Sequence, residues 1–242
     1  MSSIYRPLAA SFVILLLSSF LATAFAATAI NLGTAGKFAV LARSEITLGS
    51  SATVNGDVGL SPGRSYSLDF PVLHLPLTGF GTSSLINGKV FASDYLGSVA
   101  ILAQAASDSS AAFNAAFAQA SSASDTSKMT LGAGALSGSY TPGLYNSASD
   151  ITFKEITLVG GANDVFIFRT SGSISCSSSA KVILSGGVQT KNVFWIANED
   201  ITVASKAVFQ GIMLSRGDIS LGASAVVTGN AYAQGSISIS SK

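Results

Sequence analysis

The chain has 242 residues, of which only 10% are charged, with 13 Lys and Arg against 12 Asp and Glu. A formal net charge near zero excludes nucleic acid, anionic lipid and other polyanions as partners, because each of these requires a basic surface. The single cysteine, Cys176, excludes an intrachain disulfide, so the core must be stable without one.

The first 26 residues are typical of a secretory signal peptide. Arg6 precedes an apolar run from Phe12 to Phe25, and the run ends in small residues at Ala26. A membrane anchor is the alternative, but hydroxyl residues interrupt the run and no basic cluster follows it. We expect cleavage near Ala26, secretion, and no membrane association afterwards. The mature chain then has 13 − 1 = 12 basic and 12 acidic residues, and its remaining residues, 27–242, suffice for a single domain.

One 18-residue pattern occurs three times, at residues 44–61, 199–216 and 217–234. Ile201, Ile219 and Ile237 stand 18 apart (219 − 201 = 237 − 219 = 18), and Ile46 opens the early copy. A fixed period of this length indicates stacked coils, because no single copy can bury its own apolar side. Period-2 alternation inside each copy predicts three short strands separated by corners. The sequence therefore predicts a mainly β fold, a β-solenoid of triangular cross-section.

The first strand of each copy points its isoleucines and their partners two residues later into the core, because residues two apart share a face. Cys176 continues this core column, so we interpret it as a small buried hydrophobe and not as a catalytic or metal-binding thiol. The alternate positions form an outward first-strand face of small residues. These positions are Thr47, Gly49, Ser175, Ser177, Thr202, Ala204, Ser220, Gly222, Ser238 and Ser240. We call its hydroxyl column (Thr47, Ser175, Thr202, Ser220, Ser238) the hydroxyl ladder. In the coil around residues 141–153 the pattern is poor, and Tyr145, Ser147 and Thr152 are all candidates for the ladder position.

The second strand has a mixed exterior, whereas the third strand is apolar on both sides, as in the sequence VFWIA of residues 193–197. A strand that is hydrophobic on both sides is covered on both sides. The cover is predicted to be a helix from about Ser93 to Ala120, with Ser93 as N-cap and Gly97 inside it. Its apolar stripe is Phe91, Tyr95, Val99, Leu102, Ala106, Phe113 and Phe117. An Ala- and Ser-rich linker is the alternative.

Residues 62–84 contain three prolines and follow neither pattern. They predict an irregular cap over one open end of the stack, where it would block end-to-end strand pairing.

Few residues have the chemistry of a catalytic or metal site. Glu45, Asp200 and Asp218 share the repeat position just before the first strand, and could be a metal site, a pair of catalytic acids or corner residues that bond backbone amides. We favour the last. His74 is the only histidine, which excludes a His-based triad and a multi-histidine metal site. We predict no enzyme activity, no metal and no cofactor.

Several longer motifs resemble those of the microbial and fungal ice-binding proteins, over nearly all of the chain from about Asn31. They are LGTAGKFAVLA (32–42), VNGDVGLSP (54–62), FASDY (91–95), TPGLY (141–145), VFIFRTSG (165–172) and LSGGVQTKNVFWIA (184–197). The resemblance implies a discontinuous right-handed β-solenoid with a long helix alongside, in which the order of the coils does not follow the order of the chain. It also implies an extracellular protein that adsorbs to ice, slows its growth and suppresses recrystallisation.

The residues themselves point to the surface that would bind. Coils repeat at about 4.7–4.9 Å, and small or β-branched side chains lose little entropy when held in a flat array. We therefore expect the first-strand face to contact the ice crystal, with no obligate protein partner. A polysaccharide-binding adhesion module is the main alternative, although this face has almost none of the exposed aromatic residues that stack on sugars. A polysaccharide-cleaving enzyme is a third reading, and it lacks a groove of carboxylates.

Overall fold

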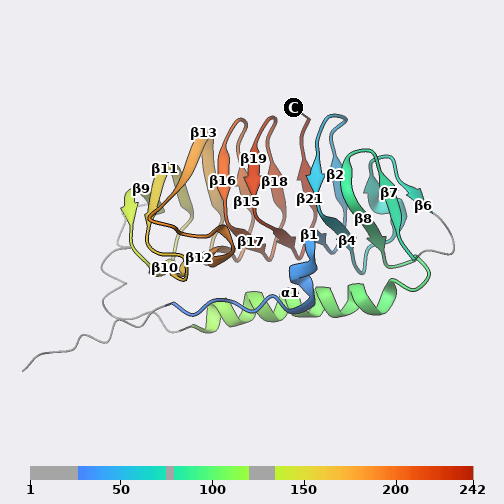
Figure 1. Cartoon of the computed structure of the whole chain (residues 1–242), viewed down its shortest axis with the longest axis horizontal. Coiled ribbons are helices and arrows are strands. Elements are labelled where there is room, and N and C mark those ends of the chain that lie inside the picture. The colour runs from blue at the N-terminus through green and yellow to red at the C-terminus, as the bar shows by residue number, and fades with distance from the viewer. Residues whose placement is uncertain (1–26, 75–78, 120–133, 242) are drawn as a thin grey trace, which may run out of the picture.

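The computed structural model describes residues 27–74, 79–119 and 134–241, so that the expected signal peptide lies outside the described residues. These residues form a stack of β coils with one long helix lying along it (Figure 1). Almost all neighbouring strands are parallel, as they must be when each coil repeats the path of the one before. The predicted β-solenoid is confirmed.

The first strands form one continuous ladder along the stack. In spatial order they are β9 (Ala135–Tyr140), β11 (Ile151–Val159), β13 (Ile174–Ser185), β15 (Ile201–Val203), β18 (Ile219–Leu221), β21 (Ile237–Ile239), β2 (Ile46–Leu48) and β5 (Leu68–Asp69). The second strands are the later parts of β9, β11 and β13, followed by β16 (Val208–Gln210), β19 (Val226–Thr228), β3 (Val54–Asn55) and the start of β8 (Ile86–Ala92), which pairs with β3. Three short strands per coil are therefore the rule in the coils that follow the 18-residue pattern.

The third strands form the other long ladder. They are β10 (Gly143–Ser147), β12 (Phe166–Thr170), β14 (Val193–Ala197), β17 (Ile212–Ser215), β20 (Ala231–Ala233), β1 (Phe38–Ala42), β4 (Asp57–Leu60) and β8 (Ile86–Ala92). Aromatic rings fill the interior behind it: Trp195 stacks on Phe168 at 4.5 Å between ring centroids and on Phe153 at 5.2 Å.

The stack is assembled from distant parts of the chain. The last strand, β21, pairs with β18 on one side and with β2 on the other, so that Ile237 lies between Ile219 and Ile46. On the third-strand face, β1 follows β20 in the same way. One coil is thus composite, with its first strand from the C-terminal end and its third strand from the N-terminal segment. The described C-terminus consequently lies in the middle of the stack (Figure 1).

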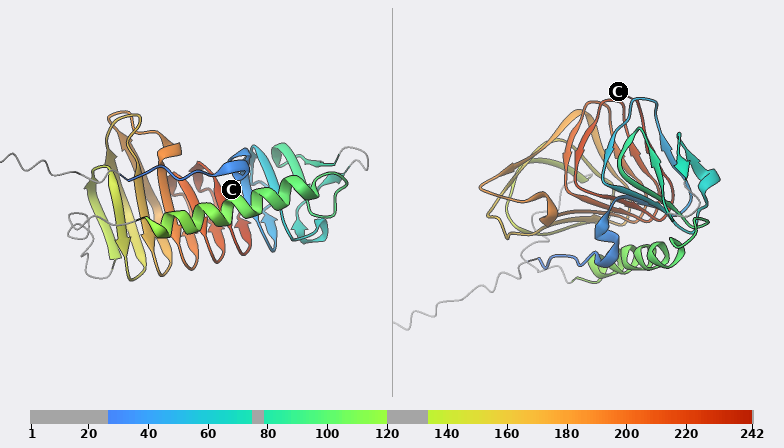
Figure 2. Two further views of the ribbon diagram at one scale, coloured as in Figure 1. Left: turned by 90° about the horizontal axis from the view of Figure 1, so that it is seen from below. Right: turned by 45° about the vertical axis from the view of Figure 1, so that its right-hand side comes forward.

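The helix α1 (Val99–Ala118) covers the third-strand face, as predicted. Figure 2 shows it crossing these strands from one end of the stack towards the other. Leu102 and Phe113 of α1 are buried with Phe194, Ile196 and Tyr232 in a second core that is separate from the solenoid interior. Both faces of the third strands are therefore buried, one by the coil and one by the helix.

The predicted start of the helix is wrong. The chain is still in β8 at Phe91, and Gly97 lies before α1 with φ +82°, a left-handed conformation that ends any helix. Ser93 is not an N-cap: its hydroxyl donates to the carbonyl of Gly63 at 2.8 Å. Of the predicted stripe, Val99 is 55% exposed, and Phe91 and Tyr95 lie outside the helix.

The predicted irregular cap at residues 62–84 is wrong in part. Leu68 and Asp69 form β5, which adds one more strand to the first-strand ladder by pairing with Ile46 and Thr47. Beyond it, β6 (Leu73–His74) and β7 (Gly81–Ser83) pair antiparallel and end the other sheet. The antiparallel strands break the coil repeat at this end.

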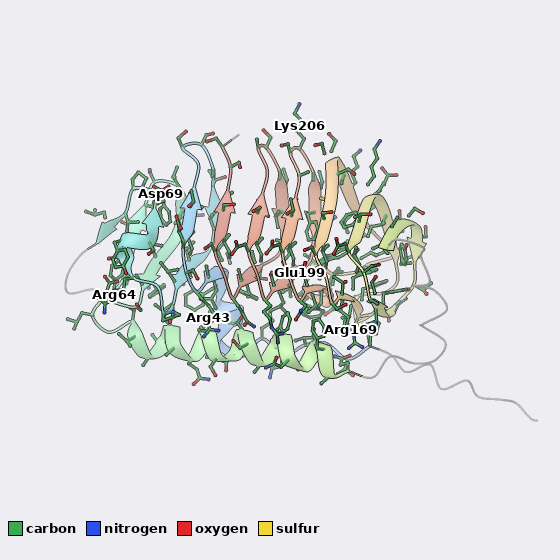
Figure 3. All side chains as sticks on the ribbon, turned by 180° about the vertical axis from the view of Figure 1, so that it is seen from behind. Arg43, Arg64, Asp69, Arg169, Glu199 and Lys206 are labelled. Atoms are coloured by element: carbon green, nitrogen blue, oxygen red, sulfur yellow. The ribbon has the colours of Figure 1, made fainter. Side chains whose placement is uncertain are left out.

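Arg169 of β12 anchors the C-terminal end of α1 (Figure 3). Its Nη1 donates to the carbonyls of Ala116, Phe117 and Gln119 at 2.8, 2.9 and 2.7 Å, and its Nε donates to Oδ1 of Asn146 at 2.7 Å. The last carbonyls of a helix have no partners within it, so a buried guanidinium that reaches those of Ala116 and Phe117, together with that of the C-cap residue Gln119, fixes where the helix ends.

Candidate functional site

The hydroxyl ladder is in register across five neighbouring strands. Ser175 of β13 is paired with Thr202 of β15, Thr202 with Ser220 of β18, Ser220 with Ser238 of β21, and Ser238 with Thr47 of β2. At the usual strand spacing these side chains form a row about 19 Å long. The N-terminal copy thus contributes its threonine to the end of a row made by the C-terminal half of the chain.

The ladder side chains point outward because the residues on both sides of each one point inward. Ile201, Val203, Ile219 and Ile237 are fully buried, whereas Thr202 and Ser238 between or after them are exposed and Ser220 is half-buried. Two neighbouring serines contact each other directly, with the hydroxyl of Ser238 donating to that of Ser220 at 3.3 Å.

The second row of the first-strand face is also small, but two of its members serve another purpose. A Cβ atom on Gly49 would lie 2.4 Å from the backbone nitrogen of Ser241, and one on Gly222 would lie 2.5 Å from that of Ser205. Glycine is therefore required there so that neighbouring coils can approach, and these positions do not offer an outward side chain. Ser177, Ala204 and Ser240 complete the row, and Ser177 and Ser240 are exposed.

Charged residues limit this surface at both ends. Asp69 of β5 takes the ladder position beside Thr47. At the other end the ladder continues to Thr152 of β11, but the exposed Lys154 follows two residues later. Between Ser175 and Thr47 no outward position of the ladder carries a charge. The uncharged area coincides with the five strands that contain the hydroxyl ladder.

Thr152 is the ladder residue of the coil in which the sequence pattern was poor. It pairs with Ser175 on one side and Ala135 on the other, and it is exposed. The other candidates, Tyr145 and Ser147, lie in the third-strand ladder and are 1% and 7% exposed. Cys176 is buried as expected, and this burial raises the pKa of its thiol, which makes it a poor nucleophile or ligand.

The acidic residues before the first strands bond the backbone of the next coil. Oδ1 of Asp200 accepts from the N–H of Asp218 at 2.8 Å, and Oδ1 of Asp218 accepts from the N–H of Ser236 at 2.7 Å. Asp150 makes the same bond to the N–H of Ser173 at 2.8 Å, a member that the sequence did not reveal because its coil departs from the 18-residue spacing. Glu45 differs, since it accepts the hydroxyl of Thr47 at 3.2 Å. The aspartates thus set the approach of successive coils beside the ladder.

No metal or membrane site emerges from the described ranges. No three His, Cys, Asp or Glu side chains in them gather closely enough to hold a metal ion. Within the same ranges, no helix combines the length and hydrophobicity needed to cross a bilayer.

Comparison with known proteins shows the family to which this chain belongs. The model of the ice-binding-like family matches residues 40–242. An ice-binding protein of Typhula ishikariensis, K1-A, is 32% identical over 193 residues, covering 78% of each chain, and one of Flammulina populicola is 32% identical over 193 residues, covering 78% of this chain and 76% of the relative. The crystal structure of a glycosylated ice-binding protein from an Arctic yeast superposes with a TM-score of 0.83 at 26% identity, covering 88% of this chain and 91% of that one. The chain therefore belongs to the ice-binding-like family.

Proposed function

We propose that this protein adsorbs to ice through the hydroxyl ladder and thereby slows ice growth and recrystallisation. The observation that carries the proposal is the row of registered, uncharged hydroxyls from Ser175 to Thr47 on one parallel sheet. The relatives named above are ice-binding proteins, which favours ice as the ligand.

The physical basis is the match between an ordered surface and an ordered solid. Side chains held by a parallel ladder have fixed spacing along and across the strands, and Ser and Thr have few rotamers to lose. Their hydroxyls can hold water in positions that merge with a lattice, and the small neighbouring residues leave the surface flat. Charged groups bind their own hydration shells, so Asp69 and Lys154 mark the limits of the proposed binding area.

The protein is proposed to act outside the cell and without catalysis. The apolar run before Ala26 supports export, and the bonding of the aspartates to backbone amides gives these acids a structural role in place of a catalytic one. Ice is then the only partner that the function requires.

Thermal hysteresis of the Thr202→Tyr and Ser220→Tyr variants tests the proposed face. A tyrosine at either position would project a ring from the middle of the flat row, so we expect both variants to lose most of their thermal hysteresis and recrystallisation inhibition. Val226→Tyr is the matched control, because Val226 is 56% exposed in the same coil as Ser220 but belongs to the second-strand face. It should retain activity.

Circular dichroism and thermal unfolding of all three variants establish that the fold is kept. Full activity of both ladder variants would refute this face as the ice-binding surface. Loss of activity in Val226→Tyr alone would transfer the function to the second-strand face, and inactivity of the unmodified protein would refute ice binding itself.

A further inference from the structure

The second-strand face is interrupted at the composite coil. This coil takes its first strand from β21 and its third strand from β1, and no second strand of the described residues lies between β19 and β3. The strand β19 pairs only with β16, and β3 pairs only with β8. We call the space between β19 and β3 the strand gap.

The burial of inward side chains shows the effect of the missing strand. One coil earlier, Ala207 and Phe209 are each 1% exposed. Their counterparts beside the strand gap, Ala225 and Val227, are only partly buried although they point into the same interior. Ile239 of β21 is partly exposed as well. The core is therefore open on this face where the second strand of the composite coil would close it.

The opening forms a cavity of about 350 Å³. It is lined by residues from both sides of the gap, including Val227 and Thr228 of one wall, Val54 and Asn55 of the other, and Val40 and Ile239 from the composite coil. Two strand spacings of about 4.8 Å separate second strands that are two coils apart, which leaves the width of one strand. The lining has an apolar floor and no charged side chain.

Both walls present backbone groups to this space. The N–H of Val226 donates to Ala207 and the carbonyl of Thr228 accepts from Gly211, so both residues face β16. Alternate residues of a parallel strand bond to opposite sides, and hence the N–H and carbonyl of Val227 face the gap. On β3, Val54 and Gly56 donate towards β8, to the carbonyls of Leu85 and Asn87, so that Asn55 faces the gap.

We propose that the strand gap binds an extended, uncharged peptide strand that runs parallel to β19 and β3 and completes the second-strand sheet. The facing edges would supply main-chain hydrogen bonds on both sides, which is the chemistry of strand addition. The space between Val54 and Val227 selects a β-branched apolar side chain pointing inward, with small polar residues on either side of it. The neutral lining disfavours a charged segment.

The position of the strand gap allows a bound strand and an uncovered hydroxyl ladder at the same time. The gap opens on the second-strand face, whereas the hydroxyl ladder lies on the first-strand face of the same coils. The described chain itself reaches the corner at which such a strand would begin, where Ser241 lies 3.5 Å from Ser50 between their hydroxyl oxygens. A strand held in the gap by another molecule would leave the ladder uncovered.

A peptide with blocked ends and the sequence of Gly222–Asn230, GASAVVTGN, tests the proposal. Fluorescence anisotropy of the labelled peptide should show saturable binding to the unmodified protein. Hydrogen exchange should show that the amides of Val227 and Asn55 exchange rapidly in the free protein and become protected on binding. A peptide in which proline replaces the valine that corresponds to Val227 should not bind, because it loses an N–H and the inward side chain.

Val227→Trp should fill the cavity and abolish binding, while the matched variant Val208→Trp, at an exposed second-strand position one coil earlier, should bind normally. Thermal hysteresis should be unchanged in both. Slow exchange of the Val227 and Asn55 amides in the free protein would overturn the proposal, and that measurement needs no variant. Absence of saturable binding, or equal binding of the proline peptide, would overturn it as well.

Discussion

Where the N-terminal strand β1 packs beside the C-terminal coils, two side chains donate hydrogen bonds to one backbone acceptor, the carbonyl of Phe38. The phenol of Tyr232 donates to it at 3.0 Å and Nδ2 of Asn230 donates to it at 2.8 Å, across 194 and 192 positions of the sequence. We propose to remove these donors singly and together, as Tyr232→Phe, Asn230→Ala and the double variant. Because each single variant leaves the other donor in place, each should lower the free energy of unfolding by about 0.5–1.5 kcal/mol.

The double variant should lose more than the sum of the two. It leaves the Phe38 carbonyl without either side-chain donor beside the buried Tyr232 ring, and an unsatisfied buried acceptor costs about 1–3 kcal/mol. We therefore expect a coupling energy of about 1 kcal/mol in a double-mutant cycle. Urea unfolding at a single temperature measures it, provided that the slope with denaturant is the same in all four proteins.

Asn192→Ala provides the matched control, because the Asn192 side chain also donates to a backbone carbonyl, that of Ala162 at 2.9 Å, in another part of the molecule. Its effect should add to that of Tyr232→Phe within about 0.5 kcal/mol. Equal additivity for Asn230→Ala and Tyr232→Phe would refute the reasoning, because the Phe38 carbonyl would then not depend on these two donors.

Three further predictions concern charge and burial. Burial raises the pKa of the Tyr232 phenol, so the folded state holds this proton more tightly than the unfolded state does. The free energy of unfolding should therefore be constant with respect to this group below the ordinary tyrosine pKa of about 10, and it should fall as the pH rises above that value. Denaturant midpoints measured across this range should decline less in Tyr232→Phe, and an equal decline would contradict the assignment. Arg169→Met should lower the free energy of unfolding by about 3 kcal/mol, because several carbonyls at the end of α1 lose their donor. Hydrogen exchange should also be faster in the last turn of α1. Unchanged exchange there would argue against Arg169 as the anchor of the helix end. Asp218→Asn keeps an oxygen for the N–H of Ser236 and removes a charge beside the ladder, so this variant should keep its stability and at least its full thermal hysteresis. Asp218→Ala should lower the free energy of unfolding by about 1 kcal/mol. Equal loss of activity in both variants would contradict a structural role for this acid.

The periodic parts of the chain could be predicted because each copy of the repeat shows the same pattern of inward apolar and outward polar residues. The spacing of Ile201, Ile219 and Ile237 predicts their stacking, and alternation around them assigns the hydroxyls to the outside, as the pairing of the strands shows. The double-sided apolar pattern of residues 193–197 likewise predicted that a helix would cover the third strands.

Where the pattern occurs once, the sequence was ambiguous. Phe91 and Tyr95 keep the helical phase of Leu102, yet neither lies in the helix. Phe91 packs against the core of Leu102 from the strand β8, whereas Tyr95 lies in a bend and packs into the solenoid interior. Only the left-handed backbone conformation of Gly97 distinguishes a continuous helix over these residues from one that begins after them. The strand β5 was missed because two residues are too few to show alternation, and Thr152 was uncertain because its coil departs from the 18-residue spacing.

The meeting of both chain ends within one coil has a consequence for how the protein folds. On one side, β1 and β2 have no neighbours except β20 and β21, which are made almost 200 residues later. Contacts of such sequence separation close slowly, because the loop entropy is lost before they form. During synthesis the N-terminal coils therefore keep an unpaired strand edge until the last repeat has emerged. Folding should be slow, with a transition state that already contains the contacts of the final coil, and a chain without that coil should aggregate through the open edge.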